Sequence, residues 1–304
     1  MNLMFSNHKK LILFIILLFQ NCLPYLFHLG QGQLEIIKNR NEISEVLEDQ
    51  KLDDSTKEKL RLVLQVREFA IKKLALNPEG GYKYFTKLDR PEVGWHVSAS
   101  YPLKFDSYTW WFPIAGKVPY KGYFDIEKAK EEEKELKEKG LDTKLRITAG
   151  YSTLGWFSDP LLSPQLKLKK YDLVSLVIHE MTHATVYFKN DSVFNESFAT
   201  FVEEIGTEIY FNSGETPEEK ELLKNYKDSK RKNKKIISEI KNTALQLKSL
   251  YDSDKSDSVK LLEKEKIIEK FRNKLLDIGK EYPSFNKTKW LKSELNNENF
   301  IGAL

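Results

Sequence analysis

The stretch that decides the fold runs from Val177 to Glu204 and reads VIHEMTHATVYFKNDSVFNESFATFVEE. It contains two histidines, His179 and His183, four positions apart, and Glu180 lies between them. On an α-helix, residues four apart share one face and are about 6 Å apart along the axis. Both imidazole rings can therefore bind one metal ion, and Glu180 is near enough to act as a base on a water there.

Two histidines do not complete a catalytic zinc site, so a third ligand is expected nearby. The helix can continue to Phe188, and turn-forming residues then separate it from a second helix that starts at Ser192. If the second helix runs back antiparallel, Glu196 returns to the level of His183. His179, His183 and Glu196 then make the two-histidine, one-glutamate set of a hydrolytic zinc enzyme.

The alternative is an ordinary amphipathic helix that carries two histidines without a metal. The chain has only five histidines, so a chance pair at this spacing around a glutamate is improbable. Apolar residues flank the motif at Leu173, Leu176, Val177 and Ile178, which indicates a buried helix. A buried histidine pair without a metal would leave ring nitrogens in need of partners. The residues favour a metal site.

The HExxH motif, followed by NExxA at residues 195–199, resembles the gluzincin branch of the zinc metallopeptidases. More closely, HEMTHATVYFKNDSVFNESFATFVEEIG is similar to a family of predicted bacterial aminopeptidases, whose members often carry a lipoprotein signal. Other segments extend this resemblance over nearly the whole chain: GQGQLEII, RLVLQVREFA, WHVSA, FPIAGKVPYKGYF, AGYSTLGWFSDPLL and ELNNENF.

The resemblance implies a zinc-dependent peptidase, and within that class an aminopeptidase. It implies a zincin-like catalytic core with one zinc ion per chain, bound by His179, His183 and Glu196. Glu180 would be the general base that acts on zinc-activated water. Zinc endopeptidase activity at the same site is a competing hypothesis, because the chain has no segment like the GxMEN sequence that binds the free amine in well-known zinc aminopeptidases.

The helix that carries Glu196 departs from the wider gluzincin pattern. Four residues after the ligand glutamate, that pattern often has an acidic residue that supports a ligand histidine, whereas this chain has Thr200. Glu203 lies seven residues after Glu196 and so on the same helix face. Glu203 can supply the missing carboxylate. The alternative is a glutamate that simply faces solvent.

The N-terminus has the pattern of a secretion signal. A basic start, MNLMFSNHKK, precedes the apolar run LILFIILLF, which is too short to span a bilayer comfortably. The single cysteine, Cys22, follows directly and resembles the lipidated cysteine of bacterial lipoproteins. We therefore expect residues 1–22 to be a signal and lipid anchor that places the protein in the bacterial cell envelope, facing the periplasm or exterior. The alternative is an uncleaved anchor that continues through LPYLFHL.

The remainder of the first 214 residues predicts a mixed α+β core over residues 23–214. Residues 53–76 have helical apolar periodicity, and WHVSAS, WWFPIAG and VPYKGYF read as short strands. LRITAGYSTLGWF reads as a strand followed by a turn. A charged helix is expected after the cap residue Asp125 and before Gly140. His28 is expected in a linker close to the anchor.

Residues 215–304 are dominated by charge and predict a helical C-terminal region that packs on the core. Thr216, followed by Pro and two Glu, is a helix start. Long helices are expected to about Tyr251 and from about Ser258 to Ile278. These helices motivate the second competing hypothesis, a non-catalytic envelope lipoprotein that binds a partner through them.

Composition excludes several other classes of protein. Hydrophobic residues make up 40% of the chain and aromatics 12%, as expected of a folded protein rather than a disordered one. The net charge of +4 comes from 49 basic and 45 acidic side chains of mixed order, so no nucleic-acid partner is expected. A single cysteine excludes an internal disulfide and a cysteine-rich metal site. The expected partners are a peptide substrate and, through Cys22, a membrane.

Overall fold

The computed structural model describes residues 23–304 except 80, 113–115, 149–158, 190, 215, 284, 286–292 and 304. Long helices and three small sheets form the described part, so the expected α+β class is confirmed. Residues 1–22, which include Cys22, lie outside the described residues, and the signal and lipid anchor stay predictions. Among the described residues, no helix combines the length and apolarity needed to cross a bilayer.

The helices in chain order are α2 (Leu23–Lys38), α3 (Ile43–Val46), α4 (Asp54–Leu74), α5 (Ile126–Glu138), α6 (Lys170–Thr185), α7 (Ser192–Asn212), α8 (Pro217–Tyr251) and α9 (Asp257–Glu281), with the short 3₁₀ helices η1 (Ser163–Lys167), η4 (Asn297–Asn299) and η5 (Ile301–Ala303). The strands are β1 (Arg40–Glu42), β2 (Tyr84–Thr86), β3 (Gly94–Ser100), β4 (Trp110–Phe112), β5 (Gly116–Val118), β6 (Tyr120–Tyr123), β7 (Asp142–Thr148) and β8 (Leu161–Leu162).

The largest strand pairing is the antiparallel sheet β6-β3-β7, in which Val97 of β3 pairs with Lys121 and Leu145. Helix α5 covers this sheet, and its Ala129 and Leu136 are fully buried in the same core cluster as Val97. A second sheet, β1-β2-β8, contains one parallel pair, and β4 and β5 form a hairpin. The sheets are small, so most of the core lies between helices.

Side-chain caps explain where several helices begin and end. The Asp125 carboxylate accepts a hydrogen bond from the Glu127 backbone N–H at the start of α5. Thr216 and Glu219 form a reciprocal capping box at the start of α8. Gly140, just beyond α5, has φ of 75°, a left-handed backbone that favours glycine. The expected helix over 53–76 is confirmed as α4, which Asp53 caps.

The expectation that His28 belongs to a linker is wrong, because His28 lies in α2. Its Nε2 atom accepts a hydrogen bond from the Phe124 N–H at 3.1 Å, and the Tyr25 hydroxyl accepts one from the Gly122 N–H at 3.1 Å. Ile36 is fully buried near the end of the helix. The apolar LPYLFHL segment, which the sequence offered as a continuation of the anchor only in the alternative interpretation, therefore packs against the strand β6 and the residue that follows it.

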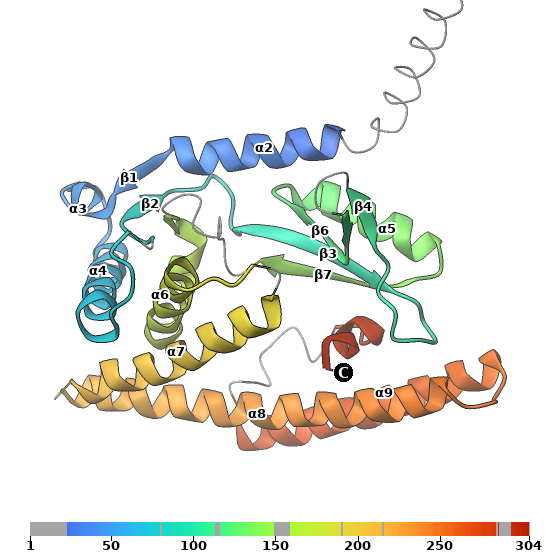
Figure 1. Cartoon of the computed structure of the whole chain (residues 1–304). Helices are drawn as coiled ribbons and strands as arrows, with labels where there is room; N and C mark the ends of the chain where they lie inside the picture. The colour runs from blue at the N-terminus through green and yellow to red at the C-terminus, as the bar shows by residue number, and fades with distance from the viewer. Residues whose placement is uncertain are drawn as a thin grey trace, which may run out of the picture.

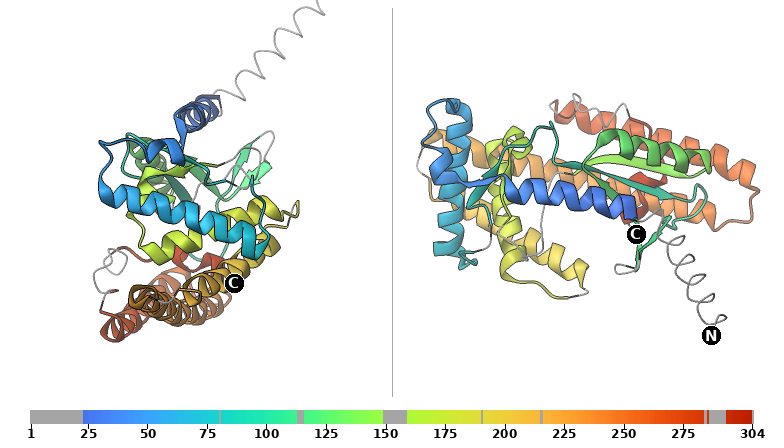
Figure 2. Two further views of the ribbon diagram at one scale, coloured as in Figure 1. Left: turned by 90° about the vertical axis from the view of Figure 1, so that its left-hand side faces the viewer. Right: turned by 90° about the horizontal axis from the view of Figure 1, so that it is seen from above.

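Helices α8 and α9 form a long hairpin on the side of the molecule opposite α2, with the strands, α6 and α7 between them (Figures 1 and 2). The chain then returns to end beside the β6-β3-β7 sheet. A polar cluster joins the α8–α9 hairpin to the β6-β3-β7 sheet. Lys264 of α9 forms an ion pair with Asp142 of β7 and donates a hydrogen bond to the Pro102 carbonyl at 2.9 Å. The Asn297 backbone N–H also donates to Asp142, at 2.9 Å.

The Lys264–Asp142 pair is expected to stabilise the docked hairpin. Lys264 is buried, so Lys264→Met would leave the carboxylate without its cation and lower the free energy of unfolding by about 3 kcal/mol. Lys266→Met is the matched control on an exposed position of the same helix, where less than about 0.5 kcal/mol is expected. Urea unfolding measures both. Equal losses in the two variants would contradict the importance of the pair.

Candidate metal centre

Helix α6 is positioned by one apolar face. This face packs against α4 in one hydrophobic core. Its fully buried residues are Leu173, Val174, Val177, Ile178 and Met181. His179, Glu180 and His183 project from the other side of the same helix, where His179 and Glu180 remain partly exposed. Burial of the apolar face therefore holds the HExxH residues at the surface of the core.

Helix α6 ends at Thr185, three residues before the predicted end at Phe188. The cap residue Val186 has an extended backbone, as suits a β-branched residue, and its N–H still binds the Thr182 carbonyl. The loop is then fixed by Asn195, which accepts from the Phe188 N–H and donates to the Phe188 carbonyl, both at 2.8 Å. Asn195 thus sets the position of the neighbouring Glu196.

Helix α7 begins at Ser192, as predicted, and Asp191 caps it by accepting from the Phe194 N–H at 3.0 Å. Gly206 lets this helix approach α6 closely. A Cβ atom at Gly206 would lie 3.2 Å from the Ile178 side chain and 2.7 Å from that of Leu74. The close approach of the two helices brings the acidic face of α7 against the histidines of α6.

The structure brings together the three residues predicted as metal ligands. The Nε2 atoms of His179 and His183 are 3.1 Å apart. The Glu196 carboxylate lies 3.6 Å from Nε2 of His179 and 3.4 Å from Nε2 of His183. In a tetrahedral zinc site with ordinary bond lengths, ligand atoms are about 3.4 Å apart. The three spacings therefore fit one such ion, and among the described residues these three form the group able to hold a metal.

The hydrogen bonds around His179 also fit a metal. Its Nδ1 atom lies 3.1 Å from a Glu203 carboxylate oxygen, an arrangement in which Nδ1 carries the proton and Nε2 presents a lone pair. That lone pair faces Nε2 of His183 and the Glu196 carboxylate. Three electron-rich groups at this spacing repel one another unless a cation or a proton lies between them. The donor set is the one that zinc prefers.

The comparison with known proteins places the chain in a family. A match to the family described as "Putative aminopeptidase" covers residues 24–304. The chain belongs to this family. No curated protein and no solved structure matches the chain. The matched residues include both the α6–α7 site and the C-terminal α8–α9 hairpin.

Lys230 of helix α8 contacts the acidic residues beside the candidate metal site. Lys230 Nζ lies 3.2 Å from Glu203 and 3.0 Å from Glu204. Lys230, Glu203 and His179 therefore form a continuous chain of contacts from the C-terminal hairpin to a predicted ligand. The alternative left open for Glu203, a glutamate that faces solvent, is wrong. Sequence reasoning missed Lys230, because no local pattern distinguishes it from its many lysine neighbours.

A cavity of about 420 Å³ adjoins the site between α6 and α8. His179, Glu180 and Leu176 contribute to one wall, and Tyr226 and Asn233 to the other. The α8 helix thus helps to shape the space beside the predicted base. Tyr187, which follows α6 in the α6–α7 loop, is exposed, and Tyr151 lies outside the described residues.

Burial shapes the proton affinities at the site. It raises the pKa of Glu180 to about 7, and the Asp159 and Glu196 carboxylates add to this increase, against the opposing charge of His179. Burial lowers the pKa of His183, and the charge of His179 lowers it further. Glu180 is therefore a stronger base than an exposed glutamate, while His183 favours the neutral form that binds metals.

Glu203 is expected to strengthen metal binding through His179. Glu203→Ala would remove the acceptor that orients this ring, and zinc affinity should fall about 10–100-fold. Glu204→Ala is the matched control, because Glu204 also pairs with Lys230, yet it is half exposed and the described structure shows no hydrogen bond or ion pair between it and His179. Competition with a coloured zinc chelator gives both affinities. Equal affinities in the two variants would remove Glu203 from the site.

Proposed function

We propose that the protein is a zinc-dependent peptidase, and within that class an aminopeptidase. The observation that carries the proposal is the meeting of the His179, His183 and Glu196 donor atoms at spacings of 3.1, 3.4 and 3.6 Å beside Glu180. Membership of the "Putative aminopeptidase" family supports the same class of activity. His179, His183 and Glu196 would hold one zinc ion per chain.

The chain's own residues supply the remaining chemistry of peptide hydrolysis. When bound, zinc would act as a Lewis acid on the peptide carbonyl and on a water molecule. Glu180 takes a proton from the attacking water and delivers it to the amine that leaves. Burial raises its pKa, so its carboxylate takes up a proton more readily than that of an exposed glutamate. Glu203, itself held by Lys230, keeps the His179 ring oriented.

The cavity beside His179 and Glu180 offers space for a substrate side chain next to the bond that is cut. We further propose that the enzyme acts on peptides at the bacterial cell envelope, anchored through a lipid on Cys22. The support is the basic and apolar sequence that precedes this cysteine.

Digestion of a peptide library, read by mass spectrometry, tests the function. Purified protein with zinc should remove N-terminal residues one at a time, and chelator treatment should stop the reaction. N-terminally acetylated copies of the same peptides should resist cleavage. Internal cleavage of the acetylated peptides would assign an endopeptidase instead. Full zinc content without any cleavage would favour a non-catalytic protein that binds a partner.

A further inference from the structure

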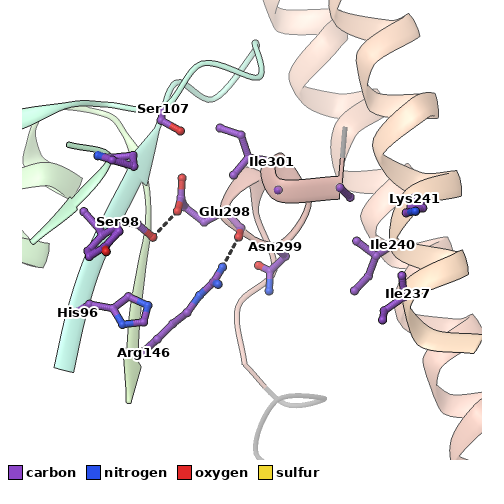
Figure 3. A pocket seen from close by; sticks show the side chains of 14 residues that line it. His96, Ser98, Ser107, Arg146, Ile237, Ile240, Lys241, Glu298, Asn299 and Ile301 are labelled. Atoms are coloured by element: carbon purple, nitrogen blue, oxygen red, sulfur yellow. Dashed lines mark hydrogen bonds between the residues drawn. The ribbon is translucent and has the colours of Figure 1, made fainter. Parts of the chain in front are cut away.

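A second cavity, of about 530 Å³, lies between the β3–β7 strands, the C-terminal turns η4 and η5, and helix α8 (Figure 3). Its volume is in the range of about 300–1,000 Å³ that is typical of small-molecule sites. It shares no lining residue with the cavity beside His179. Its walls combine charged with apolar side chains, and those that bear on its ligand are Glu298, Arg146, Ser98, Lys241, Ile237 and Ile240.

The most unusual group in this cavity is the carboxylate of Glu298, a side chain only 4% exposed. One of its oxygens accepts a hydrogen bond from the Ser98 hydroxyl, whereas Oε1 has no donor among the described residues. Figure 3 shows the carboxylate directed from η4 between Ser107 and Ile301, which both line the cavity. A buried carboxylate oxygen without a donor is costly, and a ligand ammonium is the group that complements it best.

The turn that carries Glu298 is held firmly. The Asn297 side chain donates to the Tyr101 carbonyl at 2.8 Å and accepts from the Tyr251 hydroxyl at 2.6 Å. The neighbouring Asn296 side chain donates to the Thr143 carbonyl at 2.9 Å. Glu298 is therefore fixed in place before any ligand arrives, and little conformational freedom is lost on binding.

The same cavity also contains a cation, Arg146, that can bind an anionic group of a ligand. Arg146 donates to the backbone carbonyl of Glu298, so its guanidinium lies only a side chain's length from the Glu298 carboxylate. The guanidinium has five N–H donors, and its contact with the Glu298 carbonyl uses only part of this capacity. Lys241 on α8 adds a second cation at the opposite wall. Ile237 and Ile240 lie beside Lys241 and offer an apolar surface.

We propose that this cavity binds a free α-amino acid with an aliphatic side chain. Its ammonium would donate to Glu298, its carboxylate would accept from Arg146, and its side chain would lie against Ile237 and Ile240. The ammonium and carboxylate of an α-amino acid are attached to one carbon. This suits a site in which the negative charge is the Glu298 carboxylate and the positive charge is the Arg146 guanidinium, bound to the carbonyl of the same Glu298. The proposal does not depend on hydrolysis at the α6–α7 site, although such a peptidase would release this class of compound.

Calorimetric titration of the purified chain with L-leucine tests the proposal. L-leucine should bind, and N-acetyl-L-leucine, which lacks the ammonium, should bind at least about tenfold more weakly. L-leucinamide, which lacks the carboxylate, should lose a similar factor. Glu298→Gln should weaken binding by the same order. Glu294→Gln, which changes an exposed carboxylate of the same segment, should leave binding unchanged.

The control for binding at the metal site is Glu196→Ala, which removes an exposed candidate ligand and should keep L-leucine affinity unchanged. No binding by the unaltered chain, or equal binding of N-acetyl-L-leucine, would overturn the proposal whether or not the Glu298 variant folds. Loss of binding in Glu196→Ala together with retention in Glu298→Gln would assign the ligand to the α6–α7 site instead. Peptide hydrolysis is measured separately, so failure of this proposal leaves the proposed function untouched.

Discussion

Glu180→Gln is expected to reduce peptide hydrolysis by about a thousandfold while the protein still binds zinc. Glutamine has the same shape as glutamate but cannot accept the proton from water, and loss of a general base typically costs about 10²–10⁴-fold in rate. Glu180 lies on α6 between the two candidate ligands, which is the position expected of the proposed base. Turnover of an N-terminally free peptide and metal content by atomic absorption are the two measurements.

Glu221→Gln is the matched control for this variant, because it makes the same chemical change at an exposed position of α8. It should retain both turnover and zinc. The decisive comparison is turnover per bound zinc, which separates loss of the base from loss of the metal. Unchanged turnover per zinc in Glu180→Gln would show that another group takes the proton.

The three candidate metal ligands could be predicted to lie together from the sequence because their spacing is local. His179 and His183 share a helix face by virtue of four-residue spacing, and Glu196 returns to them through one short turn. Glu203 follows Glu196 by seven residues, so its side of α7 was predictable as well. The sequence also indicated that its carboxylate would support one of the two histidines, but periodicity could not give which one, and the structure shows that it is His179.

The contribution of α8 could not be predicted, because it depends on how a distant helix docks. The sequence near Lys230 shows a charged helix, and nothing in it states that this one lysine meets Glu203. The early end of α6 at Thr185 has the same kind of cause. Asn195, ten residues later, holds the Phe188 backbone out of the helix. In both cases, a contact between separate elements decides the local structure.

The proposed role of Glu196 as a metal ligand leads to a second large expected effect. Glu196→Ala should weaken zinc binding by at least about 100-fold, because removal of a direct ligand costs more than the 10–100-fold loss of a supporting residue. Peptide hydrolysis should fall with the zinc content. The Glu196 side chain is 67% exposed, so its removal should leave the melting temperature of the metal-free protein unchanged. Zinc titration and thermal unfolding measure the two properties.

Exposure of this side chain makes the test a clean one. Truncation of buried His183 could lower zinc affinity merely by disturbing the packing of α6, whereas truncation of Glu196 leaves α7 and its contacts in place. Glu208→Ala, another partly exposed glutamate of α7, is the control and should retain full zinc affinity. If Glu196→Ala also retained it, the carboxylate would not bind the ion. The two histidines would then need a different third ligand, and the residues available on α7 for peptide hydrolysis would have to be assigned again.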